Sequence, residues 1–276
     1  MLAIQLLGPP QVTLNNHILS IPRRKSRALL FYLAANPSPV LRDQILALLW
    51  PDHDRAAAQQ VLRTTVYGLR KQLGDALIAT DDSLALAADT TVDLRRFEQQ
   101  IVNTNGNAEA TEPLAAAMAL YRGEFLAGFS VPDAEEFEQW LLGLRERCVQ
   151  LALRGYGLLA MRYEALRDFA AARDALARAI ELNPLQEDLQ RAAMRIDFFA
   201  GDRAGAIRRY EHLRRLLDDE LGVPPLEETR ALYDAIITDT MAPMAPSAPA
   251  SAPAAIAPAQ SLRPQPARLP LTGPTA

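Results

Sequence analysis

Residues 48–74 read LLWPDHDRAAAQQVLRTTVYGLRKQLG and predict a helix that begins just after a sharp turn. Pro51 ends the preceding helical pattern, and Asp54 can cap the free backbone N–H groups at the start of the next one. Apolar residues then recur at helical spacing as far as Gly74, a favourable C-terminal cap. The stretch therefore predicts two helices joined by a short turn.

One face of this predicted third helix is apolar, and the opposite face carries long hydrogen-bond donors and one aromatic ring without a carboxylate. The apolar positions are Leu62, Val66, Leu69 and Leu73. The candidates for contact with base edges are Gln60, Arg63, Thr64, Tyr67 and Arg70. Such a face suits a polyanion, and a solvated surface is the alternative interpretation.

A second group of basic residues lies near the start of an earlier predicted helix. These candidates for phosphate contact are Arg23, Arg24, Lys25 and Arg27, together with Lys71 of the third helix. They add positive charge without an evident geometry for reading bases, so we expect them to contribute mostly to the salt dependence of binding.

The remainder of the first 90 residues predicts a small α+β domain. Alternating apolar residues predict short strands between Leu2 and Ile21, and Asn15-Asn16 can turn a tight hairpin between two of them. Helices are expected from Lys25 to Asn36 and from Leu41 to Trp50. The buried stripe of the second helix is predicted to be Leu41, Ile45, Leu48 and Leu49. A terminal hairpin is expected over 77–80 and 84–88, with Asp81-Asp82-Ser83 at its tip.

From Asp93 the pattern is almost wholly helical, with a repeat of 34 residues that relates Asp168 to Asp202. This period is typical of stacked helix pairs. After Met241 the composition changes to Ala, Pro and Ser, which predicts a disordered linker. The fold is therefore expected to be mainly α, with domains at 1–90 and 91–241 and a tail at 242–276.

Charge differs strongly between the two predicted domains. Residues 1–88 hold nine basic and six acidic groups, whereas residues 89–242 hold eighteen and twenty-seven. An acidic domain repels phosphates, so any nucleic-acid contact is expected in the N-terminal third. No nucleophile motif or phosphate-binding glycine loop is present, so we expect neither an enzyme nor a cofactor.

Cysteine and histidine content points away from metal and redox chemistry. The single Cys148 excludes an internal disulfide and is expected to be a small buried hydrophobe, and the three histidines are scattered. Neither a signal peptide nor a long apolar run is visible, so no membrane contact and a cytoplasmic location are expected.

The order of strands, three helices and a hairpin resembles the OmpR-type winged helix, with residues 48–51 and 66–73 as the local match. Downstream, three segments resemble the bacterial transcriptional activator domain: Asp93-Leu94-Arg95-Arg96-Phe97, Leu120 to Leu126, and Leu221-Gly222-Val223-Pro224-Pro225. Together they cover roughly residues 1–240. This pairing is similar to that of the antibiotic-regulatory-protein (SARP) type of regulator.

The resemblance implies a transcription regulator, expected to be an activator, that binds repeats in double-stranded promoter DNA. It also implies that the TPR-like helical domain supports self-association as a homodimer or contact with RNA polymerase. Many relatives continue beyond a proline-rich linker into an ATPase module, so the 276 residues could be the front part of a longer regulator.

Two features depart from the family pattern. The predicted wing ends in Asp81-Asp82-Ser83, where relatives often place a basic residue, and Gly68 occupies a position where many relatives carry a side chain that approaches DNA. The alternative function is a TPR-like protein-interaction scaffold whose N-terminal domain has lost DNA binding.

Overall fold

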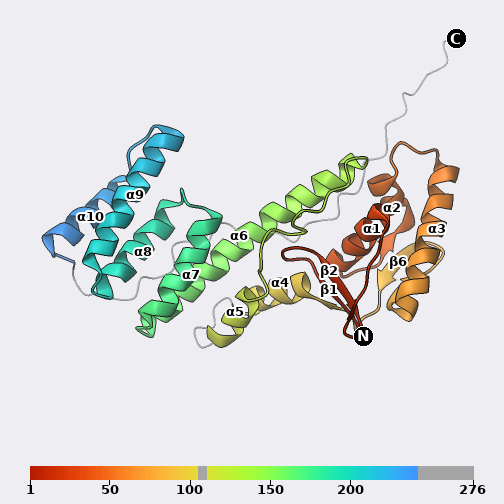
Figure 1. Ribbon diagram of the computed structural model, residues 1–276, viewed down its shortest axis with the longest axis horizontal. Coiled ribbons are helices and arrows are strands. Elements are labelled where there is room, and N and C mark those ends of the chain that lie inside the picture. The colour runs from red at the N-terminus through yellow and green to blue at the C-terminus, as the bar shows by residue number, and fades with distance from the viewer. Residues whose placement is uncertain (105–110, 242–276) are drawn as a thin grey trace, which may run out of the picture. The chain divides into compact units, whose positions relative to one another are not determined.

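The computed structural model describes residues 1–104 and 111–241, and residues Met1–Thr240 form one compact unit. The described part is mainly helical, with two small sheets near the N-terminus (Figure 1). The predicted tail at 242–276 lies outside the described residues.

The first sheet is built from the predicted N-terminal strands. The sheet contains β1 (Leu2–Gln5), β2 (Gln11–Leu14) and β3 (His17–Ile18), in which β2 pairs antiparallel with β1 on one side and with β3 on the other. Asn15 and Asn16, between β2 and β3, have φ angles of 50° and 65°. This left-handed pair confirms the predicted tight hairpin. A strand that the sequence did not predict, β7 (Thr91–Val92), runs parallel to β1 on its other side.

Three helices follow closely the predicted bounds: α1 (Arg24–Ala35), α2 (Arg42–Leu49) and α3 (Arg55–Leu73). Asp54 caps α3, because its carboxylate accepts a 2.9 Å hydrogen bond from the Ala57 N–H. Gly74 ends the helix with a φ of 58°.

The prediction that Leu41 belongs to the buried stripe of the second helix is wrong. Leu41 is 51% exposed, because it lies in the two-residue strand β4 (Val40–Leu41), where Val40 points inward instead. Side chains alternate along a strand, so only one of the two can be buried on the same face.

The predicted hairpin after α3 is present and is joined by β4. A short 3-10 turn (Gly74–Ala76) leads into β5 (Leu77–Ala79), which pairs antiparallel with β6 (Ser83–Leu86), and β6 pairs with β4 on its other edge. The Arg42 guanidinium donates to the Thr80 carbonyl at 3.0 Å, which ties the base of the hairpin tip to the start of α2.

Seven helices make up the rest of the described chain. They are α4 (Asp93–Thr104), α5 (Thr111–Met118), α6 (Glu135–Ala165), α7 (Phe169–Leu182), α8 (Glu187–Phe199), α9 (Arg203–Leu221) and α10 (Glu227–Thr238). From α4 to α10 each helix packs against the next. Asp168 caps α7 and Asp202 caps α9, each through a backbone N–H three residues on, which matches the 34-residue repeat.

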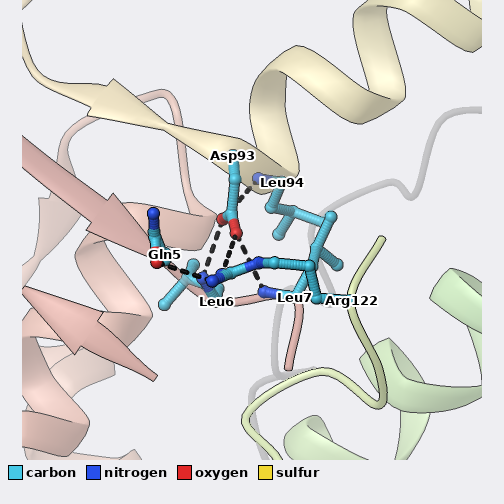
Figure 2. Close-up of polar contacts among 6 residues, drawn as sticks. All are labelled: Gln5, Leu6, Leu7, Asp93, Leu94 and Arg122. Carbon is cyan, nitrogen blue, oxygen red and sulfur yellow. Dashed lines mark hydrogen bonds and ion pairs between the residues drawn. The ribbon is translucent and has the colours of Figure 1, made fainter. Parts of the chain in front are cut away.

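Asp93, at the start of α4, connects the helical part to the N-terminal sheet (Figure 2). Its buried carboxylate accepts hydrogen bonds from the backbone N–H groups of Leu6, Leu7 and Leu94 at 2.7, 3.1 and 2.8 Å. Arg122 lies 3.4 Å from the same carboxylate and also donates to Gln5. Burial raises the pKa of Asp93, and the three N–H groups and Arg122 oppose that rise.

The segment around Glu124 also connects to the N-terminal part, because it hydrogen-bonds along the backbone that follows β1. Gly8 donates to the Glu124 carbonyl at 3.0 Å, and Leu126 donates to the Leu6 carbonyl at 2.8 Å. Gly8 has a φ of 114°, and a Cβ added there would lie 3.4 Å from the Cβ of Arg122. Glycine therefore suits this position on two grounds, its backbone conformation and the close approach of a second segment.

Candidate nucleic-acid interface

Helix α3 is held in place by its apolar side. Leu62, Val66, Leu69 and Leu73 are buried, as predicted, and the helix contacts α1, α2 and β5. Burial of four such side chains fixes the rotation of the helix about its axis, because any other rotation would expose them. The opposite side is consequently directed to solvent.

All five predicted base-contact residues lie on this exposed side of α3. Gln60, Arg63, Thr64 and Arg70 are exposed, and Tyr67 is 73% exposed although it is aromatic. Arg63 donates to the Gln60 side-chain oxygen at 3.4 Å, and the Thr64 hydroxyl donates to the Gln60 backbone carbonyl at 3.0 Å. We call these five residues, with the exposed Lys71, the α3 face.

The α3 face carries positive charge and no carboxylate. No Asp or Glu occurs between Arg55 and Leu73. Arg55 itself makes an exposed two-bond contact with Asp43 of α2, at 3.0 and 3.2 Å, so it is engaged at the turn between the helices. The basic groups that remain on the face are Arg63, Arg70 and Lys71.

The predicted basic cluster at the start of α1 divides into two pairs. Arg23 and Arg24 are exposed. Lys25 forms a 2.8 Å ion pair with Asp133 and lies 5.8 Å from the centre of the Trp50 ring, and the Arg27 guanidinium lies 5.3 Å from the ring of Phe129. Lys25 and Arg27 are therefore directed toward the loop before α6, and the proximity of Lys25 lowers the pKa of Asp133.

Acidic residues elsewhere have structural roles. The first turn of α6 contains Glu135, Glu136 and Glu138, and the Glu138 carboxylate accepts a hydrogen bond from the Val131 N–H just before that helix. Within residues 1–104 and 111–241, no group of three or more His, Cys, Asp or Glu is placed to hold a metal ion. No helix in those ranges is long and apolar enough to cross a membrane.

Four residues that join the helical part to the N-terminal part, here called the junction residues, were given no structural role by the sequence pattern. These residues are Asp93, Arg95, Arg122 and Phe125, which the sequence places only within segments that resemble the family. All four contact the N-terminal part of the chain. Arg95, for example, donates hydrogen bonds to the carbonyls of Leu33, Ala34 and Asn36 at the end of α1. Gln5, the partner of Arg122, lies 117 residues away in the sequence. No local periodicity could have signalled these contacts.

Comparison with known proteins places this arrangement in a family. The model of the bacterial transcriptional activator domain matches residues 92–237. The chain is 29% identical over 249 residues to the regulatory protein AfsR of Streptomyces griseus, and 28% identical over 254 residues to the transcriptional regulatory protein EmbR of Mycobacterium tuberculosis. These alignments cover 86% and 84% of this chain but only 24% of AfsR and 62% of EmbR.

A solved structure is similar over the same range. It is described as Mycobacterium tuberculosis EmbR in complex with a low-affinity phosphopeptide, and it matches with a TM-score of 0.68 at 26% identity. The match covers 86% of this chain and 65% of that one. Because the family model spans more than half of the 276 residues, the chain belongs to the bacterial transcriptional activator domain family, in the company of SARP-type transcriptional regulators.

Proposed function

We propose that the chain is a sequence-specific DNA-binding transcription regulator that acts as an activator. In this proposal residues 1–90 form an OmpR-type winged helix-turn-helix, with α2 and α3 as the helix-turn-helix and α3 in the major groove. The observation that carries the proposal is the α3 face, an exposed and carboxylate-free surface on a helix whose rotation is fixed by four buried leucine and valine side chains.

Within this proposal the residues have separate tasks. Gln60, Arg63, Thr64, Tyr67 and Arg70 contact base edges, and an arginine that binds guanine through two hydrogen bonds contributes about 1–3 kcal/mol of discrimination. Arg23, Arg24 and Lys71 remain free to neutralise phosphates. Lys25 and Arg27 are left out of the phosphate group, because both contact residues at 129–133.

The TPR-like helical part is proposed to bind protein. Its acidic composition disfavours DNA, and its family is named for transcriptional activation. We therefore assign self-association as a homodimer, or contact with RNA polymerase, to α4–α10. The hairpin tip at Asp81-Asp82 is proposed to stay away from phosphates, because two exposed carboxylates would be repelled by them.

A DNA titration of the whole chain tests the proposal. The full 276-residue protein is titrated against promoter DNA at two salt concentrations, and the double variant Arg63→Ala/Arg70→Ala is compared with Arg154→Ala/Arg178→Ala, which removes two exposed arginines from α6 and α7. We expect tight, salt-sensitive binding that falls at least tenfold in the α3 variant only. Equal loss in both variants, or none in either, would reject the α3 face, and no binding by the parent would favour the scaffold alternative.

A further inference from the structure

The exposed side of α3 has two arginines on one flank and, on the other, two small uncharged residues followed one turn later by Lys71. Arg63 and Arg70 lie two turns apart on one flank, whereas Thr64 and Gly68 lie one turn apart on the other, with Tyr67 between them. The pair Thr64 and Gly68 differs in chemistry from the rest of the face, because neither residue offers an extended polar group to a base.

Thr64 has a side-chain conformation that uses its hydroxyl within the helix. The hydroxyl donates to the Gln60 carbonyl at 3.0 Å, while the residue as a whole is exposed. This bond holds the oxygen against the backbone and leaves the γ-methyl group as the part of the side chain that is available to a partner. Thr64 is therefore suited to apolar contact.

Gly68 leaves an open space next to Thr64. Apart from the two adjacent residues and the helix's own neighbouring backbone, no heavy atom of the described residues lies within 4 Å of the position that a Cβ would take. Gly155 is a contrasting case, because a Cβ there would meet the Met118 sulfur. Glycine lowers helix stability relative to alanine, and the packing of the protein gives no reason for it at position 68.

We propose that Thr64 and Gly68 together read a thymine, whose C5-methyl group enters the space above Gly68 and packs against the Thr64 methyl. Contact between an apolar side chain and the thymine methyl is a known form of major-groove readout. The inference rests on the proposed function, since it requires α3 to lie in the major groove, and it assigns a specific base to one flank of the helix.

The test uses deoxyuridine, which differs from thymidine only in the missing methyl group. Duplexes bound by the full chain are selected from a random library, and each thymine of the selected site is then replaced singly by deoxyuridine. We expect one position at which the parent loses about threefold to tenfold in affinity, the range for removing one buried methyl group. A selected site without a constant thymine, or with no sensitive position, would overturn the inference.

Four variants connect that position to the two residues. Thr64→Ser keeps the hydroxyl and removes the methyl group, so the sensitivity to deoxyuridine should disappear; Thr64→Val keeps a methyl group and should retain it. Gly68→Ala fills the space and should abolish or reverse the preference for thymine. Gly143→Ala makes the same change at an exposed position of α6 whose Cβ also meets nothing within 4 Å, and should leave the preference unchanged.

Stability and binding separate the possible failures. Gly68→Ala and Gly143→Ala should both raise the Tm, by about 2–4 °C, so weaker binding by the first cannot be ascribed to unfolding. A preference for thymine that persists in both Thr64→Ser and Gly68→Ala would overturn the inference while leaving DNA binding intact. Failure of the parent to select any DNA would instead reject the proposed function, and the inference with it.

Discussion

Single residues at the junction form contacts between distant parts of the chain that their neighbours in the sequence do not indicate. Asp93 is 7% exposed, and its carboxylate accepts hydrogen bonds from the backbone N–H groups of Leu6 and Leu7, which follow β1 nearly 90 positions earlier in the chain. Lys25 was predicted to contact phosphate from its place in a basic run, yet its ammonium group pairs with Asp133. A run of charges cannot predict which of its members find partners that are distant in sequence.

Replacement of Asp93 by Asn is expected to destabilise the protein. The amide nitrogen would face backbone N–H groups that now donate to a carboxylate oxygen, so at least one buried donor loses its acceptor, at a cost of about 2–4 kcal/mol. Urea unfolding followed by circular dichroism measures the loss. Asp234→Asn, at an exposed position of α10, serves as the control, and equal midpoints for the two variants would argue against the junction role.

Cys148 is expected to be unreactive in the native protein. It is fully buried, and burial raises the pKa of its thiol to about 12, so almost no thiolate is present at pH 8. Native protein should therefore react with iodoacetamide at least a hundredfold more slowly than protein in urea, where the thiol recovers its ordinary pKa. Comparable rates in the two states would contradict the buried position.

Elements as a whole were predicted well where the sequence contains its own start and stop signals. Helix α3 begins after its Asp54 cap and ends at Gly74, and the Asn15-Asn16 turn matches β2 and β3. The strands β4 and β7 were missed, because each has two residues and exists only through pairing with β6 or β1. The burial of Leu41 was predicted wrongly for the same reason. The assignment of Thr64 to apolar contact also required the structure, because it depends on the hydrogen bond from the Thr64 hydroxyl to the Gln60 carbonyl.

The repeated caps of α7 and α9 give a prediction at this scale. Asp168→Ala removes the acceptor of the Ala171 N–H, which lies at 3.0 Å, and should lower the free energy of unfolding by about 1 kcal/mol. Asp174→Ala, in the middle of the same helix and exposed, should leave it unchanged or slightly higher. Thermal unfolding of the two variants checks the difference, and an equal effect would show that the cap contributes nothing.

At the scale of the whole molecule, the two predicted domains share contacts that a boundary at residue 90 would cut. Strand β7, the Asp93 carboxylate and the segment around Glu124 all lie beyond that boundary and bind the N-terminal sheet. The separation into a basic and an acidic part is evident from sequence. The extent of the contact between these two parts is not evident from sequence, because the contact is made largely by backbone N–H and carbonyl groups. Every residue has such groups, so the sequence does not mark the ones that pair.

A fragment of residues 1–90 should consequently be less stable than a fragment of residues 1–240. In the shorter fragment the fully buried Leu6 and Leu7 lose both apolar neighbours and hydrogen-bond acceptors. Urea unfolding monitored by circular dichroism should give a clearly lower midpoint for residues 1–90. The 1–240 fragment should match the whole chain, and equal midpoints for all three proteins would contradict the shared junction.

The claim that the α3 face lies against DNA is tested most directly by cleavage from a reagent placed on that face. Because Cys148 is buried, an iron-chelate cleaving reagent can be attached selectively at Gln60→Cys, and at Leu142→Cys on the exposed side of α6 as the control. We expect the reagent at position 60 to cut the bound duplex within the protected site and the reagent at position 142 to leave it uncut. DNA that is bound and protected but left uncut from position 60 would contradict the placement of the α3 face against DNA.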